Sequence, residues 1–358
     1  MKKLLVTLLC IGIVFPLLWT SDAGAATIRK REFRFASAFP QPSASLMSTS
    51  FLAWMDEVTA KTNGLITFKP FWGASLGTPA EHVSLVQKGM ADIIGTNIQY
   101  NPGRFPAEQI EYAFAFGPTD PVLMVKVRQQ MRKEFPQLDE NMAKEGLVNI
   151  MSASGCYYQI MSREPVKTLE DFKGKKCSLI GRYMGRWVEP LGIVPVVVPV
   201  QERYTMLQTK VLDMDLLNFD QFDAFKIYEQ APNALMADLM IGVFANLIIS
   251  KKIFDSLEPE LQQIMLKAGE EVSIRLAETE VPKWTKQTHE RMKAAGVQFF
   301  TISDADKATW ASKIDDIPAE WAEEMTGFGY PGWNMVKRFI QLTEEGGYVW
   351  ARQWGQKK

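Results

Sequence analysis

Residues 65–95 decide the fold class of this chain, and they read L-I-T-F-K-P-F-W-G-A-S-L-G-T-P-A-E-H-V-S-L-V-Q-K-G-M-A-D-I-I-G. The run 65–70 is typical of a strand, and two glycines lead from it into a helix expected over 79–88, with Pro79 in its first turn. Gly89 ends this helix, and 91–95 is typical of a buried strand. Strand, helix and strand at roughly 30-residue spacing predict a βαβ unit with parallel strands.

The same alternation extends to both sides of this unit. Before it, 33–35 alternates apolar and polar residues, and a helix is expected over 43–61, closed by Asn63 and Gly64. After a helical segment at 122–145, we expect strands at 148–154, 175–179, 194–198 and 211–217, and helices at 168–172, 184–191 and 202–209. Two such rhythms, in a chain of 358 residues, predict two lobes of α/β structure.

One long helical stretch follows these rhythms, over 258–295, with apolar residues at mixed three- and four-residue spacing. Pro282 interrupts the pattern and should kink the helix or divide it in two. A helix of this length exceeds one small lobe, so we expect it to span both lobes.

The first 25 residues have the order of a secretory signal peptide: Lys2 and Lys3, the apolar run 4–19, and the small-residue site Ala23-Gly24-Ala25. Cleavage is expected after Ala25; the alternative is an uncleaved anchor. Cys10 lies inside the apolar run and is not interpreted as a lipid-bearing cysteine. No second long apolar run follows, so a soluble mature protein is predicted.

Composition argues against nucleic-acid binding and against catalysis. The formal charge of the chain is −1, so removal of two lysines and one aspartate with residues 1–25 leaves −2, and no basic run is present. The two histidines, His82 and His289, lie in separate predicted helices and do not form a zinc-ligand pair. A nucleophile elbow, a phosphate loop and a dinucleotide fingerprint are all absent from the sequence. We therefore expect no enzyme activity and no cofactor.

Two further groups of residues leave alternatives open. The acidic cluster Asp213, Asp215, Asp220 and Asp223 suggests Ca²⁺, but it lacks the loop glycine and final glutamate of a calcium loop, and solvated strand-end carboxylates are the other interpretation. No metal site is therefore predicted. Cys156 and Cys177 form a disulfide or remain two buried thiols.

Aromatic residues at predicted strand ends and loops favour binding over catalysis, because ligands of open α/β sheets lie at the carboxyl ends of strands and between domains. Core packing is the other interpretation of each. These aromatic residues are Trp72, Tyr100, Tyr157, Tyr158, Trp187, Phe219, Phe222 and Phe225.

Seven stretches, in order over about 33–323, resemble the extracytoplasmic solute-binding proteins of TRAP (tripartite ATP-independent periplasmic) transporters, the DctP family. They are F-R-F-A-S-A-F-P, D-E-V-T-A-K-T-N-G-L-I, G-A-S-L-G-T, V-Q-K-G-M-A-D-I, E-P-V-K-T-L-E-D-F-K-G-K-K, Q-E-R-Y-T-M-L-Q-T-K-V-L-D and K-K-I-F-D-S-L-E-P-E-L-Q-Q-I-M. Each stretch alone is weak, whereas their order and spacing are specific.

The resemblance implies a two-lobed periplasmic binding protein fold, with mixed sheets flanked by helices and a ligand cleft between the lobes. Lobe I is then 26–152 plus about 243–283, and lobe II is 153–242 plus about 284–358. The implied function is capture of a small organic ligand by lobe closure in the periplasm. The implied partners are two integral membrane subunits of the transporter, one small and one large.

The chain departs from the family pattern where a carboxylate is usually held. Ser178 takes the place of an arginine that grips the carboxylate bidentately, Tyr158 aligns near the other common basic contact, and Leu217 replaces a polar anchor. Either the ligand is neutral, aromatic or apolar, which we favour, or it is an organic acid and Arg182 or Arg186 compensates. Solvated helix-face positions are the plain alternative for both arginines.

Family positions and the aromatic residues together give the predicted ligand-binding set: Phe39, Trp72, Glu81, Asn97, Tyr157, Tyr158, Ser178, Arg182, Leu217, Asn218 and Phe219. A ligand-sensing subunit of a signalling system would use the same closure, and an exported hydrolase is a third hypothesis. Transport is the function we predict.

Overall fold

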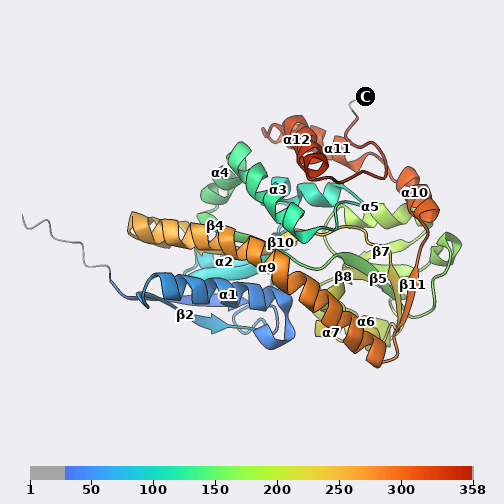
Figure 1. Ribbon diagram of the computed structural model, residues 1–358, viewed down its shortest axis with the longest axis horizontal. Coiled ribbons are helices and arrows are strands. Elements are labelled where there is room, and N and C mark those ends of the chain that lie inside the picture. The colour runs from blue at the N-terminus through green and yellow to red at the C-terminus, as the bar shows by residue number, and fades with distance from the viewer. Residues whose placement is uncertain (1–28, 357–358) are drawn as a thin grey trace, which may run out of the picture.

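The computed structural model describes residues 29–356, apart from the side chains of Gln99 and Phe244, and it contains two sheets covered by helices (Figure 1). The predicted signal peptide, with Cys10 and the cleavage site at Ala25, lies outside the described residues. Within the described part of the chain, no helix is both long and apolar enough to cross a bilayer.

The first sheet has the strand order β2-β1-β3-β10-β4. Its strands are β1 (Arg31–Ser37), β2 (Ile66–Phe71), β3 (Ile93–Asn97), β4 (Leu147–Ser154) and β10 (Val243–Ser250). β1 runs parallel to β2 and β3, as the βαβ pattern predicted, whereas β10 is antiparallel to β3 and β4. The helices of this lobe are α1 (Leu46–Lys61) and α2 (His82–Gln87), with α8 (Lys251–Asp255) after β10.

The second sheet has the order β11-β9-β5-β8-β6-β7. Its strands are β5 (Tyr158–Ser162), β6 (Lys176–Leu179), β7 (Val194–Val197), β8 (Met214–Asn218), β9 (Asn233–Met236) and β11 (Gln298–Thr301). Its helices are α5 (Met184–Val188), α6 (Val200–Gln208) and α7 (Phe219–Ala224). β5 is antiparallel to β8 while β6 is parallel to both β7 and β8, so each lobe has the mixed sheet that was predicted.

Short 3-10 helices connect these elements. They cover Pro42–Ala44, Ile98–Tyr100, Pro106–Ala113, Leu169–Phe172, Glu189–Leu191 and Ile227–Glu229. The one at Leu169–Phe172 begins with a capping box formed by Thr168 and Asp171, as expected for a short capped helix at 168–172.

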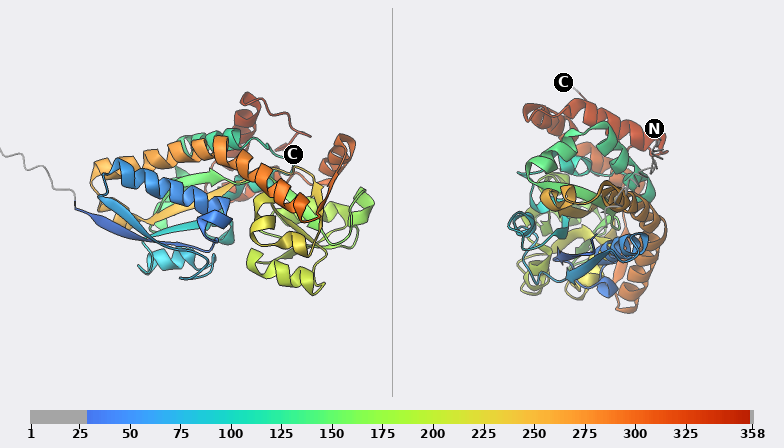
Figure 2. Two further views of the ribbon diagram at one scale, coloured as in Figure 1. Left: turned by 60° about the horizontal axis from the view of Figure 1, so that its bottom comes forward. Right: turned by 90° about the vertical axis from the view of Figure 1, so that its left-hand side faces the viewer.

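α9 (Pro259–Ala294) is the long predicted helix, and it runs over both lobes (Figures 1 and 2). It stays one helix through Pro282 and bends on the way, because proline donates no hydrogen bond to the preceding turn. Gly269 lies against β4, where an added Cβ would be 2.0 Å from the carbonyl oxygen of Ile150. Only glycine fits this close approach of helix and sheet.

The remaining helices are α3 (Pro121–Glu134), α4 (Gln137–Lys144), α10 (Asp304–Lys313), α11 (Ile317–Gly327) and α12 (Gly332–Glu345). α12 returns to α3, where Arg338 Nε is 2.8 Å from Glu134 Oε2, and Phe339 stacks on Phe114 at 4.9 Å. Part of the segment 284–358, expected in lobe II, therefore lies against elements of 26–152. The exact lobe boundaries stay a prediction.

The two cysteines are buried free thiols. Cys156 accepts a hydrogen bond from the Thr285 hydroxyl at 3.2 Å, and Cys177 lies within β6. Of the two alternatives for this pair, a disulfide or two buried thiols, the structure has the buried thiols.

Candidate functional site

The two lobes meet at the carboxyl end of β3 and at the start of α6. The Tyr100 hydroxyl, just after β3, accepts a hydrogen bond from the backbone N–H of Val200, the first residue of α6. Burial raises the pKa of Tyr100, and Asp215 adds to this effect while Arg203 opposes it. The charges of Arg203 and Asp215, both in the second lobe, therefore act on the hydroxyl of Tyr100 in the first lobe.

Ser178, Asp215 and Arg203 form a buried polar cluster in the second lobe. Ser178 and Asp215 are register partners in the parallel strands β6 and β8. The Ser178 hydroxyl donates to Asp215 Oδ1 at 2.9 Å, and Arg203 Nη1 of α6 donates to the same oxygen at 2.6 Å. The side chains of Arg203 and Asp215 are both 0% exposed. The serine that replaces the expected arginine thus contacts a neutralised ion pair.

Asp215 shows the cost of this burial. Loss of water raises its pKa, and the charge of Arg203 together with hydrogen bonds from Ser178 and Arg203 partly offsets the rise. Its second oxygen, Oδ2, is buried and has no hydrogen-bond partner among the residues that the structure describes. A buried ion pair of this kind is strongly destabilised when one partner is removed, typically by about 3–5 kcal/mol.

Tyr158 lies at the start of β5, opposite Asn218 at the end of β8. Its hydroxyl is 3.3 Å from that of Tyr112, and the rings meet edge to face at 6.0 Å. The indole N–H of Trp187 donates to the Tyr112 carbonyl at 3.1 Å. Burial raises the pKa of Tyr158, so its phenol stays protonated and can donate a hydrogen bond.

Asn218 and Leu217 end β8 with little exposure, at 1% each. Asn218 Nδ2 donates to the Cys156 carbonyl at 2.8 Å, and Leu217 is the register partner of Gln159. Burial raises the pKa of the next acidic residue, Asp220, to about 6. Of the acidic group considered for Ca²⁺, Asp215 and Asp220 are buried, and the described residues contain no cluster of three or more metal-ligating side chains.

The predicted residues of the first lobe divide into two groups. Phe39, Trp72 and Asn97 lie at the ends of β1, β2 and β3, where Trp72 meets Phe35 edge to face at 5.0 Å. Glu81, in contrast, is exposed, and its carboxylate accepts hydrogen bonds from the backbone N–H and the hydroxyl of Thr78, both at 2.8 Å. This pairing is local, and a ligand role for Glu81 stays a prediction.

Tyr157 and Phe219 lie together, on the side of the junction that faces α9. Their rings stack at 6.1 Å with an angle of 19°. They line a cavity of about 520 Å³ whose wall includes Pro282 and His289 of α9. Ser178, which is fully buried, does not line this cavity.

Arg182 and Arg186, the two residues predicted to compensate for the lost arginine, are paired with α11. Arg182 Nη1 contacts Glu324, and Arg186 contacts Glu320 and, at 3.0 Å, Asp315. The structure gives neither guanidinium a contact with Ser178. Their role in binding stays a prediction.

Comparison with known proteins agrees with this architecture. Residues 37–324 match the family described as bacterial extracellular solute-binding protein, family 7, DctP. The chain belongs to this family. A solute-binding protein of Sulfitobacter sp. (strain NAS-14.1) is 25% identical over 293 residues, which cover 81% of this chain and 86% of that protein.

Solved structures of DctP-type proteins share the fold. A TRAP solute-binding protein of Rhodoferax ferrireducens T118, in complex with copurified benzoate, has a TM-score of 0.78 at 21% identity over 88% of this chain and 98% of that one. A TRAP periplasmic solute-binding protein of Xanthobacter autotrophicus Py2, with bound β-D-galacturonate, has a TM-score of 0.73 at 24% identity over 86% and 98%. The chain described here is thus a bacterial extracellular solute-binding protein of the DctP family, and it shares the fold of these solved structures.

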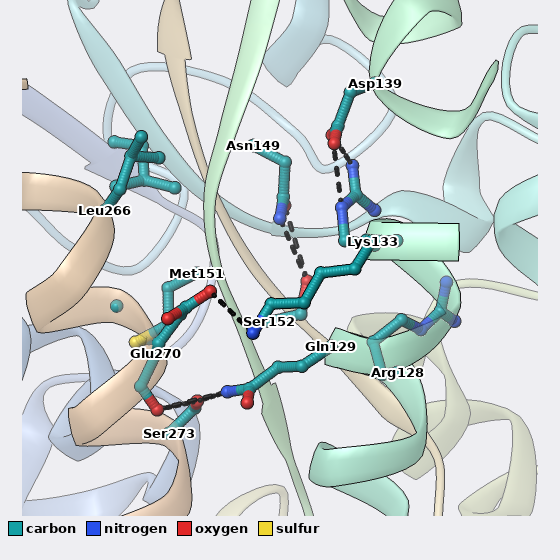
Figure 3. Close-up of a pocket in the computed structure, with 13 residues that line it drawn as sticks. Arg128, Gln129, Lys133, Asp139, Asn149, Met151, Ser152, Leu266, Glu270 and Ser273 are labelled. Carbon is teal, nitrogen blue, oxygen red and sulfur yellow. Dashed lines mark hydrogen bonds and ion pairs between the residues drawn. The ribbon is translucent and has the colours of Figure 1, made fainter. Parts of the chain in front are cut away.

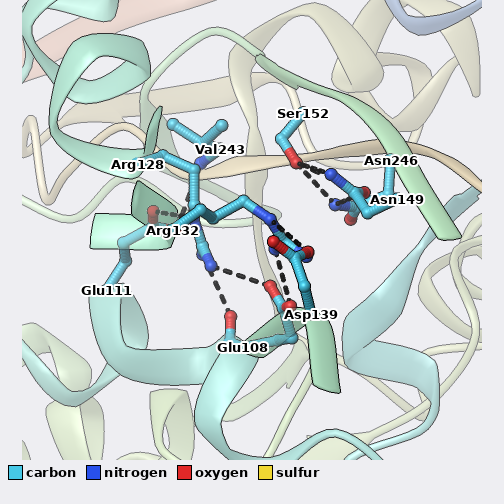
Figure 4. A network of polar contacts seen from close by, with 9 residues as sticks. All are labelled: Glu108, Glu111, Arg128, Arg132, Asp139, Asn149, Ser152, Val243 and Asn246. Carbon is cyan, nitrogen blue, oxygen red and sulfur yellow. Dashed lines mark hydrogen bonds and ion pairs between the residues drawn. The ribbon is translucent and has the colours of Figure 1, made fainter. Parts of the chain in front are cut away.

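A second polar region of this DctP protein lies within the first lobe. A cavity of about 270 Å³ opens between α3, β4 and α9, lined by Lys133 and Glu270 among others (Figure 3). Arg128, which also lines this cavity, donates to Glu111 at 2.8 Å and to Glu108 at 2.9 Å, and all three side chains are at most 4% exposed (Figure 4). Glu111 also accepts from the backbone N–H of Val243, the first residue of β10. This network joins α3 to the strand that leads back from the second lobe.

Arg203 is the site residue that sequence reasoning missed. It appears within the family stretch Q-E-R-Y, but nothing in its helical spacing distinguishes it from a solvated helix-face residue. The available signal was Asp215, because an acidic residue in the middle of a buried strand needs a cationic or hydrogen-bonding partner.

Proposed function

We propose that this protein is the periplasmic receptor of a TRAP transporter for a small uncharged cargo, aromatic or largely apolar in part, which binds between the lobes. The observation that carries the proposal is the cluster at Ser178. The usual arginine is absent there, and the charge of nearby Arg203 is already neutralised by Asp215 at 2.6 Å.

A carboxylate cargo would have to displace Asp215 from Arg203. The displaced carboxylate would then be buried without a cation, at a cost of several kcal/mol. An uncharged cargo meets no such cost, and Tyr158 offers it a flat ring and a polar hydroxyl in the same region.

Closure of the lobes would enclose the cargo and create the surface that the membrane subunits recognise. The hydrogen bond from the Val200 amide to Tyr100 supports this proposal, because it links the first lobe to α6, the helix that also carries Arg203. The small and large integral membrane subunits are the proposed partners.

The test is native mass spectrometry of the protein exported by its own host, followed by release and identification of the bound molecule. We expect a molecule without net charge. The variants Arg182→Ala and Arg186→Ala should retain it as the wild type does, since both arginines are paired with α11. A released carboxylate would refute the uncharged cargo, and its loss from Arg182→Ala alone would show that Arg182 compensates.

A carboxylate cargo is the second candidate, favoured by the benzoate and β-D-galacturonate bound to the two structural relatives. Arg203 would then exchange Asp215 for the cargo. In that case Arg203→Gln should abolish retention, and Arg182→Ala should leave it unchanged.

A further inference from the structure

The cavity beside Tyr157, of about 520 Å³, lies where the chain passes from one sheet to the other. Within the described residues the chain makes this passage three times: from β4 to β5, from β9 to β10, and from β10 to β11 through α8 and α9. Tyr157 belongs to the first passage, Ile241 to the second and Pro282 to the third, and all of them line the cavity. One cavity therefore contacts every connection between the sheets that the structure describes.

The two extended connections are hydrogen-bonded to each other and to the segment before α3. The Tyr158 amide donates to the Met240 carbonyl at 2.8 Å, and the Ile241 amide donates to the Pro118 carbonyl at 2.9 Å. α9 forms a further wall around its bend at Pro282 (Figure 1). Contacts of the protein itself thus hold these walls in place, as is typical of small-molecule sites, whose volumes are about 300–1,000 Å³.

Aromatic rings line this cavity. The rings of Tyr157 and Phe219 stack with their centroids 6.1 Å apart, at an angle of 19°. His289 also lines the cavity, and its ring lies 4.2 Å from that of Phe299, which in turn meets Phe219 edge to face at 6.5 Å. A flat aromatic molecule packs on such rings in offset-stacked or edge-to-face geometry, and it gains more than the burial of its area alone provides.

The charged groups at the cavity offset each other. Lys286 Nζ and Glu290 Oε1 lie 4.0 Å apart on α9, so the pair attracts neither anions nor cations strongly. The Tyr157 hydroxyl makes no hydrogen bond with another residue that the structure describes. A phenol both donates and accepts, so it can form a hydrogen bond with an uncharged ligand.

We propose that this cavity is a second ligand site, which binds a small uncharged aromatic molecule that carries a hydroxyl or N–H group. The ring of the ligand packs on Tyr157 and Phe219, and its polar group forms a hydrogen bond with the Tyr157 hydroxyl. The site goes beyond the proposed function, because Ser178 does not line it and because it does not depend on the charge of the cargo. A ligand that contacts all three connections restrains them together.

The measurement is a titration of the exported, methyl-labelled protein, followed by the nuclear magnetic resonance signals of the Ile241 and Val281 methyl groups, which line the cavity. The compounds are 2-naphthol, decahydro-2-naphthol, which lacks the aromatic rings, and 2-naphthoate, which is negatively charged. We expect 2-naphthol to bind with a dissociation constant below about 1 mM, and at least about tenfold more tightly than either of the others. Hydrogen exchange at 155–158 and 239–242 should slow at least about twofold on binding.

Thr119→Trp tests the location of the site. Thr119 is exposed and lines the cavity, so the replacement adds an indole to its wall, and the affinity for 2-naphthol should fall at least about tenfold. Thr326→Trp is the matched control, because Thr326 is exposed on α11 and does not line the cavity. Tyr157→Phe keeps the ring and loses the hydroxyl, and the affinity should fall about fivefold. Thermal unfolding reports whether each variant folds.

The wild type also tests the location, through nuclear Overhauser contacts from the ring protons of 2-naphthol to the methyl groups of Ile241 and Val281. Absence of binding, absence of these contacts, or wild-type affinity in folded Thr119→Trp overturns the site. Failure of 2-naphthol to bind about tenfold more tightly than both other compounds, or unchanged affinity in Tyr157→Phe, overturns the assigned class of ligand. Unchanged hydrogen exchange overturns the restraint on the connections.

Discussion

Asp220 should make the stability of this protein fall as the pH rises through the acidic range. The residue is 2% exposed, in the first turn of α7, and its Oδ1 has no partner among the described residues. Burial raises its pKa from 3.8 to about 6, with a smaller contribution from the negative charge of Asp223. A shift of about two units corresponds to about 3 kcal/mol.

The sign follows from proton binding. Between about pH 4 and pH 6 the folded protein binds a proton at Asp220 that the unfolded chain releases, so the free energy of unfolding decreases as the pH rises, and the loss is complete above the folded pKa. Asp220→Asn removes this ionisation without changing the size of the side chain. The variant should match the wild type near pH 4 and exceed its stability by about 3 kcal/mol at pH 8.

Urea unfolding of the mature protein at pH steps from 4 to 8 measures this difference. Other titrating groups are shared by both proteins, so their effects cancel in the comparison. Asp255→Asn is the control, an exposed carboxylate on α8 whose ion pair with Lys251 is lost at an expected cost of about 0–1 kcal/mol. A gap between Asp220→Asn and wild type that is equal at pH 4 and pH 8 would refute the reasoning.

Three further changes test other features. Burial lowers the pKa of His82 to about 4, so the wild type should lose about 3 kcal/mol between pH 6.5 and pH 4, and His82→Gln should lack this loss in thermal melts. Gly269→Ala forces a Cβ to 2.0 Å from the Ile150 oxygen and should cost about 3 kcal/mol in urea unfolding, whereas Gly103→Ala, with open space around it, should cost less than about 0.5 kcal/mol. Tyr100→Phe removes the acceptor for the first amide of α6, and calorimetric titration with the identified cargo should show affinity about fivefold lower.

The sequence predicted well the helices that are determined by residues close together in the chain. The long helix was expected at 258–295 and is found at 259–294, because a first-turn proline and a sustained apolar spacing mark it. α2 is shorter than the helix expected at 79–88, since Glu81 binds back to Thr78 and holds the preceding segment as a turn. The hydrogen bonds between Thr78 and Glu81 form this turn. The same residue types also occur in the first turn of a helix, so composition did not distinguish the two.

The centre of the candidate site was less accessible to prediction because its contacts join distant segments. Ser178 was recognised by its place in a family stretch, but its partners Asp215 and Arg203 come from β8 and α6. Arg182 was favoured as a cation by its closeness to Ser178 in sequence, and its side chain instead reaches Glu324, 142 positions away. Arg182 and Arg186 are both paired with α11, a helix more than 100 residues later in the chain. The spacing of residues around Ser178 does not predict this packing.

The position of β10 has a consequence for how this chain folds during synthesis and for its proposed export. β10 lies between β3 and β4, so the first sheet stays in two separate parts until residues 243–250 have been synthesised. Its covering helix α9 is later still, at Pro259–Ala294. The amino-terminal half therefore lacks a complete core while it leaves the ribosome, and contacts of such sequence separation form slowly. We expect the chain to remain extended long enough to pass through a secretion channel, with folding completed only on the far side.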